Sequence, residues 1–156
     1  MHPSVERVAT ALRAGGAPGE VRELEESTRT AAEAAAALGV PVGAIVKSLV
    51  FAADGEPVLV LASGDHQVDT NAVARLLAVS HVGRADADLV RDATGFAIGG
   101  VAPVGHPRPL RTVVDRHLAT FDVVWAAAGT PRAVFPTTYD ELVRLTGGSP
   151  ADIAAA

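Results

Sequence analysis

The sequence predicts an α+β fold built on a mixed, mostly antiparallel sheet. One clear β-hairpin lies near the middle of the chain, and the other strand-like segments are short and irregularly mixed with short helices. A doubly wound parallel sheet is disfavoured because it needs helices at regular intervals between the strands. The 156 residues, 49% hydrophobic and 20% charged, predict a single domain over 1–156 that can bury a core without disulfides.

The first third of the chain is predicted to hold two helices and an edge strand. Ser4 is expected to cap a helix that stops before the glycine-rich stretch 15–19. Residues 20–25 alternate around two apolar side chains, which predicts the edge strand. An alanine-rich helix follows over 31–38, and Gly39 ends it.

The predicted hairpin joins the apolar runs 45–51 and 58–62 through a turn at Asp54 and Gly55. The elements expected after it are a helix capped by Asp69, a strand at 79–82, a helix at 86–93, strands at 112–115, 122–126 and 134–135, a helix capped by Thr138, and a final helical turn at 149–150.

Composition excludes several classes of function. The chain has no cysteine, which rules out disulfides, a cysteine nucleophile and cysteine-bound zinc. The five histidines show no metal-ligand spacing, so we expect neither a metal nor a cofactor. No apolar run is long enough to span a membrane and no signal peptide is evident, so we expect a cytoplasmic protein. With a net charge of −5, contacts to nucleic acid would have to be local.

Lys47 is the single lysine in a chain with twelve arginines, and it lies inside an apolar strand-like run. Alternation along the strand places it on one face with Ile45 and Leu49. A lysine there is costly unless it is paired or faces a pocket, although it could also protect a sheet edge. The run is not a phosphate loop, because Val46 stands where that motif needs a glycine.

The glycine-rich segment 94–106 is the second candidate for chemistry. Gly99 and Gly100 could direct two amide groups at one oxygen, although a tight loop or bulge explains the pattern as well. His106 follows this segment and could face a site or lie on the surface. Asp115 ends an apolar strand and could act in a site or bind backbone N–H groups at a turn.

Together, the segments 45–51, 94–105, 113–115 and 127–129 resemble the YbaK / prolyl-tRNA-synthetase-associated editing domain, in that family's order. The resemblance extends from about Val21 to Leu145. It implies a mixed, mainly antiparallel sheet that curls toward a barrel, with helices packed around it. It also implies an enzyme that hydrolyses mischarged aminoacyl-tRNA in trans, without a metal, a cofactor or a covalent nucleophile.

The resemblance assigns roles to particular residues. Lys47 is implied to lie near the ester at the tRNA 3′ end, with the amides of Gly99 and Gly100 at the carbonyl oxygen. The further residues implied to contact the substrate are Ser48, Phe96, Pro103, His106, Asp115 and Gly129.

Specificity and partners stay open at this level. Members specific for cysteinyl-tRNA resemble one another in an early tyrosine and a late acidic residue, and both are absent here. Alanine, serine and threonine are therefore candidates beside cysteine, and a synthetase could hold the tRNA. The alternatives are a non-catalytic module that binds a tRNA end or a synthetase, and a hydrolase of another small ester or amide.

Overall fold

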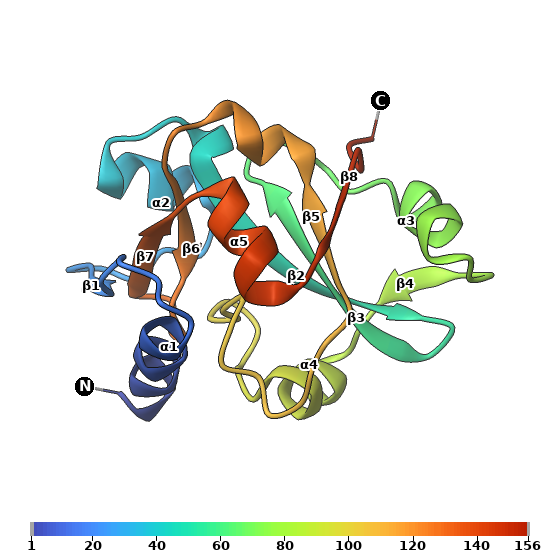
Figure 1. Ribbon diagram of the computed structural model, residues 1–156, viewed down its shortest axis with the longest axis horizontal. Coiled ribbons are helices and arrows are strands. Elements are labelled where there is room, and N and C mark those ends of the chain that lie inside the picture. The colour runs from blue at the N-terminus through green and yellow to red at the C-terminus, as the bar shows by residue number, and fades with distance from the viewer. Residues whose placement is uncertain (1, 156) are drawn as a thin grey trace.

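The computed structural model describes residues 2–155 and has an eight-stranded mixed sheet at its centre, with helices around it (Figure 1). The strand order is β1-β7-β6-β2-β3-β5-β8, and β4 pairs with β2 outside this path. The strands are β1 (Arg22–Glu23), β2 (Ile45–Ala53), β3 (Glu56–Ser63), β4 (Val82–Arg84), β5 (Thr112–Asp115), β6 (Val124–Ala127), β7 (Ala133–Thr137) and β8 (Ser149–Ala151).

The predicted fold class is confirmed, and the sheet is mixed as expected. The pairs β1–β7, β6–β7, β2–β3 and β2–β4 are antiparallel. The pairs β2–β6, β3–β5 and β5–β8 are parallel, because long connections return the chain to the same edge of the sheet.

The helix caps expected at Asp69 and Thr138 are present, and Thr30 and Asp86 cap two further helices. The side chains of Thr30, Asp69, Asp86 and Thr138 each accept a backbone N–H in the first turn of their helix. The helices are α1 (Pro3–Ala14), α2 (Ala31–Leu38), α3 (Thr70–Leu77), α4 (Ala87–Thr94) and α5 (Tyr139–Thr146), with 3₁₀ turns η1 (Val42–Ala44) and η2 (Arg116–Thr120). None of the described helices is long and apolar enough to cross a membrane.

Three local predictions are wrong. His2, not Ser4, caps α1: its Nδ1 accepts the Ser4 N–H, and Pro3 occupies the first helical position. The strand expected at 79–82 begins at Val82, because Ala78 ends α3 in a left-handed conformation and displaces the strand along the chain. The expected helical turn at 149–150 is strand β8, which lies at the sheet's edge where a proline is tolerated.

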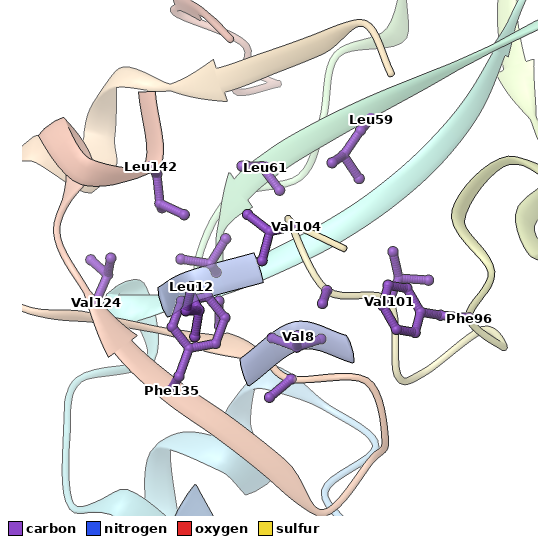
Figure 2. Packing of buried hydrophobic residues seen from close by; sticks show 14 of the residues in the cluster. Val8, Leu12, Leu59, Leu61, Phe96, Val101, Val104, Val124, Phe135 and Leu142 are labelled. Carbon is purple, nitrogen blue, oxygen red and sulfur yellow. The ribbon is translucent and has the colours of Figure 1, made fainter. Parts of the chain in front are cut away.

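Strand β3 is buried on both faces and divides the interior into two clusters. Leu59 and Leu61 point into the larger cluster, with Leu12 of α1, Phe135 of β7 and Leu142 of α5 (Figure 2). The residues that alternate with them point to a second cluster beneath α3. The hairpin of β2 and β3 is therefore the rigid centre of the molecule.

One edge of β2 has a gap in its pairing. Residues 45 and 46 pair with β6, residues 51–53 pair with β4, and β3 covers the opposite edge along nearly the whole strand. Within the described residues, 47–50 therefore have no strand neighbour on this edge. Lys47 lies in this gap.

Candidate functional site

A cavity of about 870 Å³ opens at the gap in the pairing of β2. Its walls come from residues 45–51 of β2, from residues 28–32 and Ala34 before and within α2, from Ile98, Gly99 and Val101 of the glycine-rich loop, and from the hairpin of β6 and β7. Its volume falls within the range of about 300–1,000 Å³ that is usual for small-molecule sites. The two candidate segments of the sequence, the Lys47 strand and the glycine-rich loop, thus meet around one cavity.

The charged side chains that line the cavity are all cationic. They are Arg29 from the segment before α2, Lys47 from β2 and Arg84 from β4, and no carboxylate from the described residues joins them. The cavity is thus locally positive in a chain whose net charge is −5. The arrangement favours an anionic ligand, because opposite charge attracts most strongly where water is partly excluded.

Lys47 is half-buried, and its ammonium group is held by the protein. Nζ donates a hydrogen bond to the main-chain carbonyl of His66, in the loop after β3. Burial lowers the pKa of Lys47, and the nearby charges of Asp65 and Asp115 oppose that shift. Lys47 therefore brings a positioned cation to the cavity.

Ser48 follows Lys47 on β2 and also lines the cavity. Its Oγ is buried and has no hydrogen-bond partner among the described residues. A buried hydroxyl without a partner costs roughly 1–3 kcal/mol. Such a group is available to a ligand that enters the cavity.

The two glycines of the loop differ in their availability. The Gly100 amide donates to Ala97 O at 3.0 Å, which closes a turn with Gly99 at its third position and φ +95°. A glycine is favoured there because left-handed backbone is strained for other residues. Gly99 lines the cavity, and its amide has no acceptor among the described residues. The expected pair of free amides is thus reduced to one.

Three other predicted residues of this segment do not line the cavity. Phe96 is buried in the core, with the Arg7 guanidinium 4.3 Å above its ring. Pro103 and His106 line a separate hollow that α1 and α5 border. His106 Nε2 is 2.8 Å from Ala102 O, and burial lowers the pKa of the imidazole. Phe96, Pro103 and His106 therefore pack against the body of the protein, while Gly99 lines the cavity.

Gly129 and Asp115 also lie outside the cavity lining. A Cβ on Gly129 would come within 2.7 Å of Ser4 O, so a glycine is needed for the close approach of β6 to α1. Asp115 is 1% exposed. Its carboxylate accepts the backbone N–H groups of Ser63 and His117, each at 3.0 Å, and contacts His66 Nδ1 at 2.8 Å. Asp115 thus fixes the loops after β3 and β5.

Sequence reasoning missed Arg29, Arg84, and the contact of Lys47 with the loop after β3. Arg84 reaches the cavity because it pairs with Phe51 in the β2–β4 register. Arg29 reaches it through the turn before α2. Local patterns contain no signal for these positions, since they depend on strand order.

A family model described as the aminoacyl-tRNA editing domain matches residues 25–145. The chain belongs to this family. The match includes both candidate segments, and the family resemblance seen in the sequence is confirmed.

Solved and curated relatives agree with this assignment. A crystal structure provisionally described as a trans-editing enzyme for prolyl tRNA synthetase is 46% identical, with a TM-score of 0.94, and the match covers 100% of this chain and 99% of that one. The uncharacterized protein YwhH of Bacillus subtilis is 31% identical over 89% of this chain and 88% of its own length. A proline–tRNA ligase of Bacillus licheniformis is 38% identical over 73% of this chain. The region that matches this chain is only about a fifth of the length of that ligase.

Proposed function

We propose that this editing domain hydrolyses the ester bond between a small amino acid and the 3′ end of a mischarged tRNA. Family membership supports aminoacyl-tRNA editing as the class of reaction. The observation that carries the proposal is the cavity where Lys47, Ser48 and Gly99 meet, in which two polar groups have no protein partner.

The residues suggest how hydrolysis would proceed. A water oxygen attacks the ester carbonyl carbon, the bond from that carbon to the ribose oxygen breaks, and the ribose oxygen leaves with a proton. The free amide of Gly99 would donate to the carbonyl oxygen as negative charge develops there. Because none of the described residues that line the cavity carries a carboxylate, the proton from the water would pass to solvent or to a group of the substrate itself.

The three cations support a substrate that carries phosphates. Lys47, Arg29 and Arg84 line the cavity that would receive the terminal nucleotide. Phosphate contacts of this kind make binding weaker as salt rises. An acidic chain offers little to the rest of the tRNA, so a synthetase that holds the tRNA body is the partner we propose.

The amino acid would occupy the part of the cavity beside Ser48. The apolar residues that line the cavity include Val50, Val90 and Val101. Alanine, cysteine, serine and threonine are the candidates, since a synthetase cannot reject a small side chain by binding alone when a methylene is worth only about 1–3 kcal/mol.

Deacylation of a panel of mischarged tRNAs tests the proposal. Wild type should release one or two small amino acids, and Lys47→Ala should lower that rate by about 100-fold, because a substrate that loses a positioning contact and shifts by about 1 Å can lose that much. Arg75→Ala is the matched control, because Arg75 is an exposed cation on α3 away from the cavity. Full activity in Lys47→Ala would refute the assigned role.

A non-catalytic module on the same fold is the second candidate, favoured by the absence of a carboxylate from the cavity lining among the described residues. It predicts binding of a tRNA end without turnover for every member of the panel. The same assay, run beside a tRNA-binding measurement, separates the two functions.

A further inference from the structure

A second cluster of polar side chains lies outside the cavity, where β3 and β5 end. These strands are parallel neighbours, so the loops that follow them meet at one edge of the sheet. The loop after β3 carries Asp65 and His66, and η2 after β5 carries His117. The fold thus brings together two histidines that are far apart in the sequence and show no ligand spacing there.

The three side chains converge closely enough to share one ion. One ligand atom from each lies within 4.8 Å of the others. The imidazoles of His66 and His117 stack with their centroids 4.3 Å apart, and His117 Nε2 is 3.5 Å from Asp65 Oδ2. Around a tetrahedral zinc ion with bonds of about 2.0–2.1 Å, ligand atoms are about 3.3 Å apart. Closing the site needs ligand-atom shifts of up to about 1.5 Å and a rotation of the stacked imidazoles, because the lone pair of a ring nitrogen lies in the plane of its ring.

Asp115 prepares His66 for this role. Its buried carboxylate accepts a hydrogen bond from His66 Nδ1 at 2.8 Å, which leaves Nε2 as the nitrogen available to an ion. The same carboxylate accepts the His117 backbone N–H, which ties both histidine-bearing segments to one anchor. Zinc-bound histidines commonly donate their second nitrogen to a carboxylate in this way.

Asp65 is prepared as well. Ser63 Oγ donates to Asp65 Oδ1 at 2.8 Å. This hydrogen bond orients the carboxylate. The side chains of Asp65, His66 and His117 are 41%, 24% and 34% exposed, so an ion can enter from solvent.

We propose that Asp65, His66 and His117 form a binding site for a divalent transition-metal ion of the zinc class, with water in the remaining position. Two imidazole nitrogens and one carboxylate oxygen suit Zn²⁺ and disfavour Mg²⁺ and Ca²⁺, which prefer oxygen ligands. The site adjoins the cavity, because Lys47 Nζ donates to the carbonyl of His66. It does not depend on the proposed hydrolysis.

Zinc titration of the chelator-treated full chain tests the site by calorimetry. Wild type should bind one Zn²⁺ per chain saturably, and His117→Ala should weaken binding at least 10-fold. Asp65→Asn should also weaken it, and because Asp65 is exposed this variant should keep its fold, which circular dichroism can verify. His81→Ala is the matched control, since His81 is an exposed histidine between α3 and β4 that does not belong to this cluster.

Three results would overturn the proposal, two from the zinc titrations and one from magnesium. One is the absence of saturable zinc binding by wild type, which would leave the cluster as two carboxylate–imidazole pairs. The other is binding that His117→Ala and Asp65→Asn leave unchanged while His81→Ala lowers it. Magnesium titrated in place of zinc should give no saturable binding, and equal affinity for the two ions would also contradict the assigned ligand chemistry.

Discussion

Lys47 links the cavity to the histidine cluster of Asp65, His66 and His117, because it lines the cavity and donates to the carbonyl of His66. The hydrogen bonding of the two regions differs. In the cavity, Ser48 Oγ and the Gly99 amide have no partner among the described residues, and the charges are all positive. In the cluster, by contrast, the Asp115 carboxylate has three partners. Polar groups without a hydrogen-bond partner in the protein can bind a ligand. Polar groups that have such partners, as Asp115 does, hold neighbouring segments in place instead.

Removing the anchor of the cluster should have the largest effect on stability. We expect Asp115→Ala to lower the free energy of unfolding by about 3 kcal/mol, because it strands the buried N–H of Ser63 as well as the partners at His66 and His117. Urea denaturation measures this loss. Asp65→Ala is the control at an exposed carboxylate and should cost less than about 1 kcal/mol.

Alanine substitutions at Gly129, in the turn between β6 and β7, and at Gly99, in the loop beside the cavity, should differ in their cost to stability. Gly129→Ala should destabilise by about 2 kcal/mol, because its Cβ would meet Ser4 O and its φ is +105°. Gly99→Ala has the same kind of backbone strain but open space around the Cβ, so it should cost only about 1 kcal/mol. Equal losses in thermal unfolding experiments would contradict the assigned difference in packing.

Two serines on neighbouring strands give a closer test. Ser48→Ala should leave stability unchanged or raise it by up to about 1 kcal/mol, because the hydroxyl has no partner to lose, and should reduce deacylation. Ser63→Ala should instead lower stability by about 1–2 kcal/mol, since that hydroxyl lies 2.6 Å from Gly43 O and 2.8 Å from Asp65 Oδ1. A destabilised Ser48→Ala would show that the cavity hydroxyl is satisfied by the protein.

The smallest expected effect on stability is at His106, which is hydrogen-bonded to Ala102 O and lies outside both the cavity and the histidine cluster. Burial lowers its pKa in the folded state, so the unfolded chain binds the proton more readily. Stability from this group is fully present above the ordinary histidine pKa and is lost as pH falls below it. Between pH 7.5 and 5.5, wild type should therefore lose more stability in urea than His106→Gln does. An identical pH dependence in the two proteins would contradict this.

Local sequence signals predicted most elements of the fold because they act over a few residues. The hairpin of β2 and β3, the cap at Asp69 and the left-handed Gly39 depend only on neighbours in the chain. The strand at 149–150 could not be predicted in the same way, because its partner β5 lies far away in the sequence. The pairing with β5 overrides the local preference of Ser149 and Pro150 to begin a helical turn.

The site was predictable in its segments but not in its details. Lys47, Ser48 and Gly99 all line the cavity, and the roles that the resemblance implies for them stay a prediction. The amide of Gly100 donates within a turn that two adjacent glycines do not predict. Phe96 lies in the core, which depends on how its segment packs and not on the local sequence. The partners of Asp115 come from two loops that only the sheet order brings together.

The gap along β2 has a consequence for the order of folding. The hairpins β2–β3 and β6–β7 each join strands that are close in sequence, so they can form early. The cavity lies at the seam between them, where β2 meets β6 through only two residue pairs, and neither hairpin encloses it alone. In a refolding experiment, the recovery of β-sheet circular dichroism should therefore precede the recovery of ligand binding.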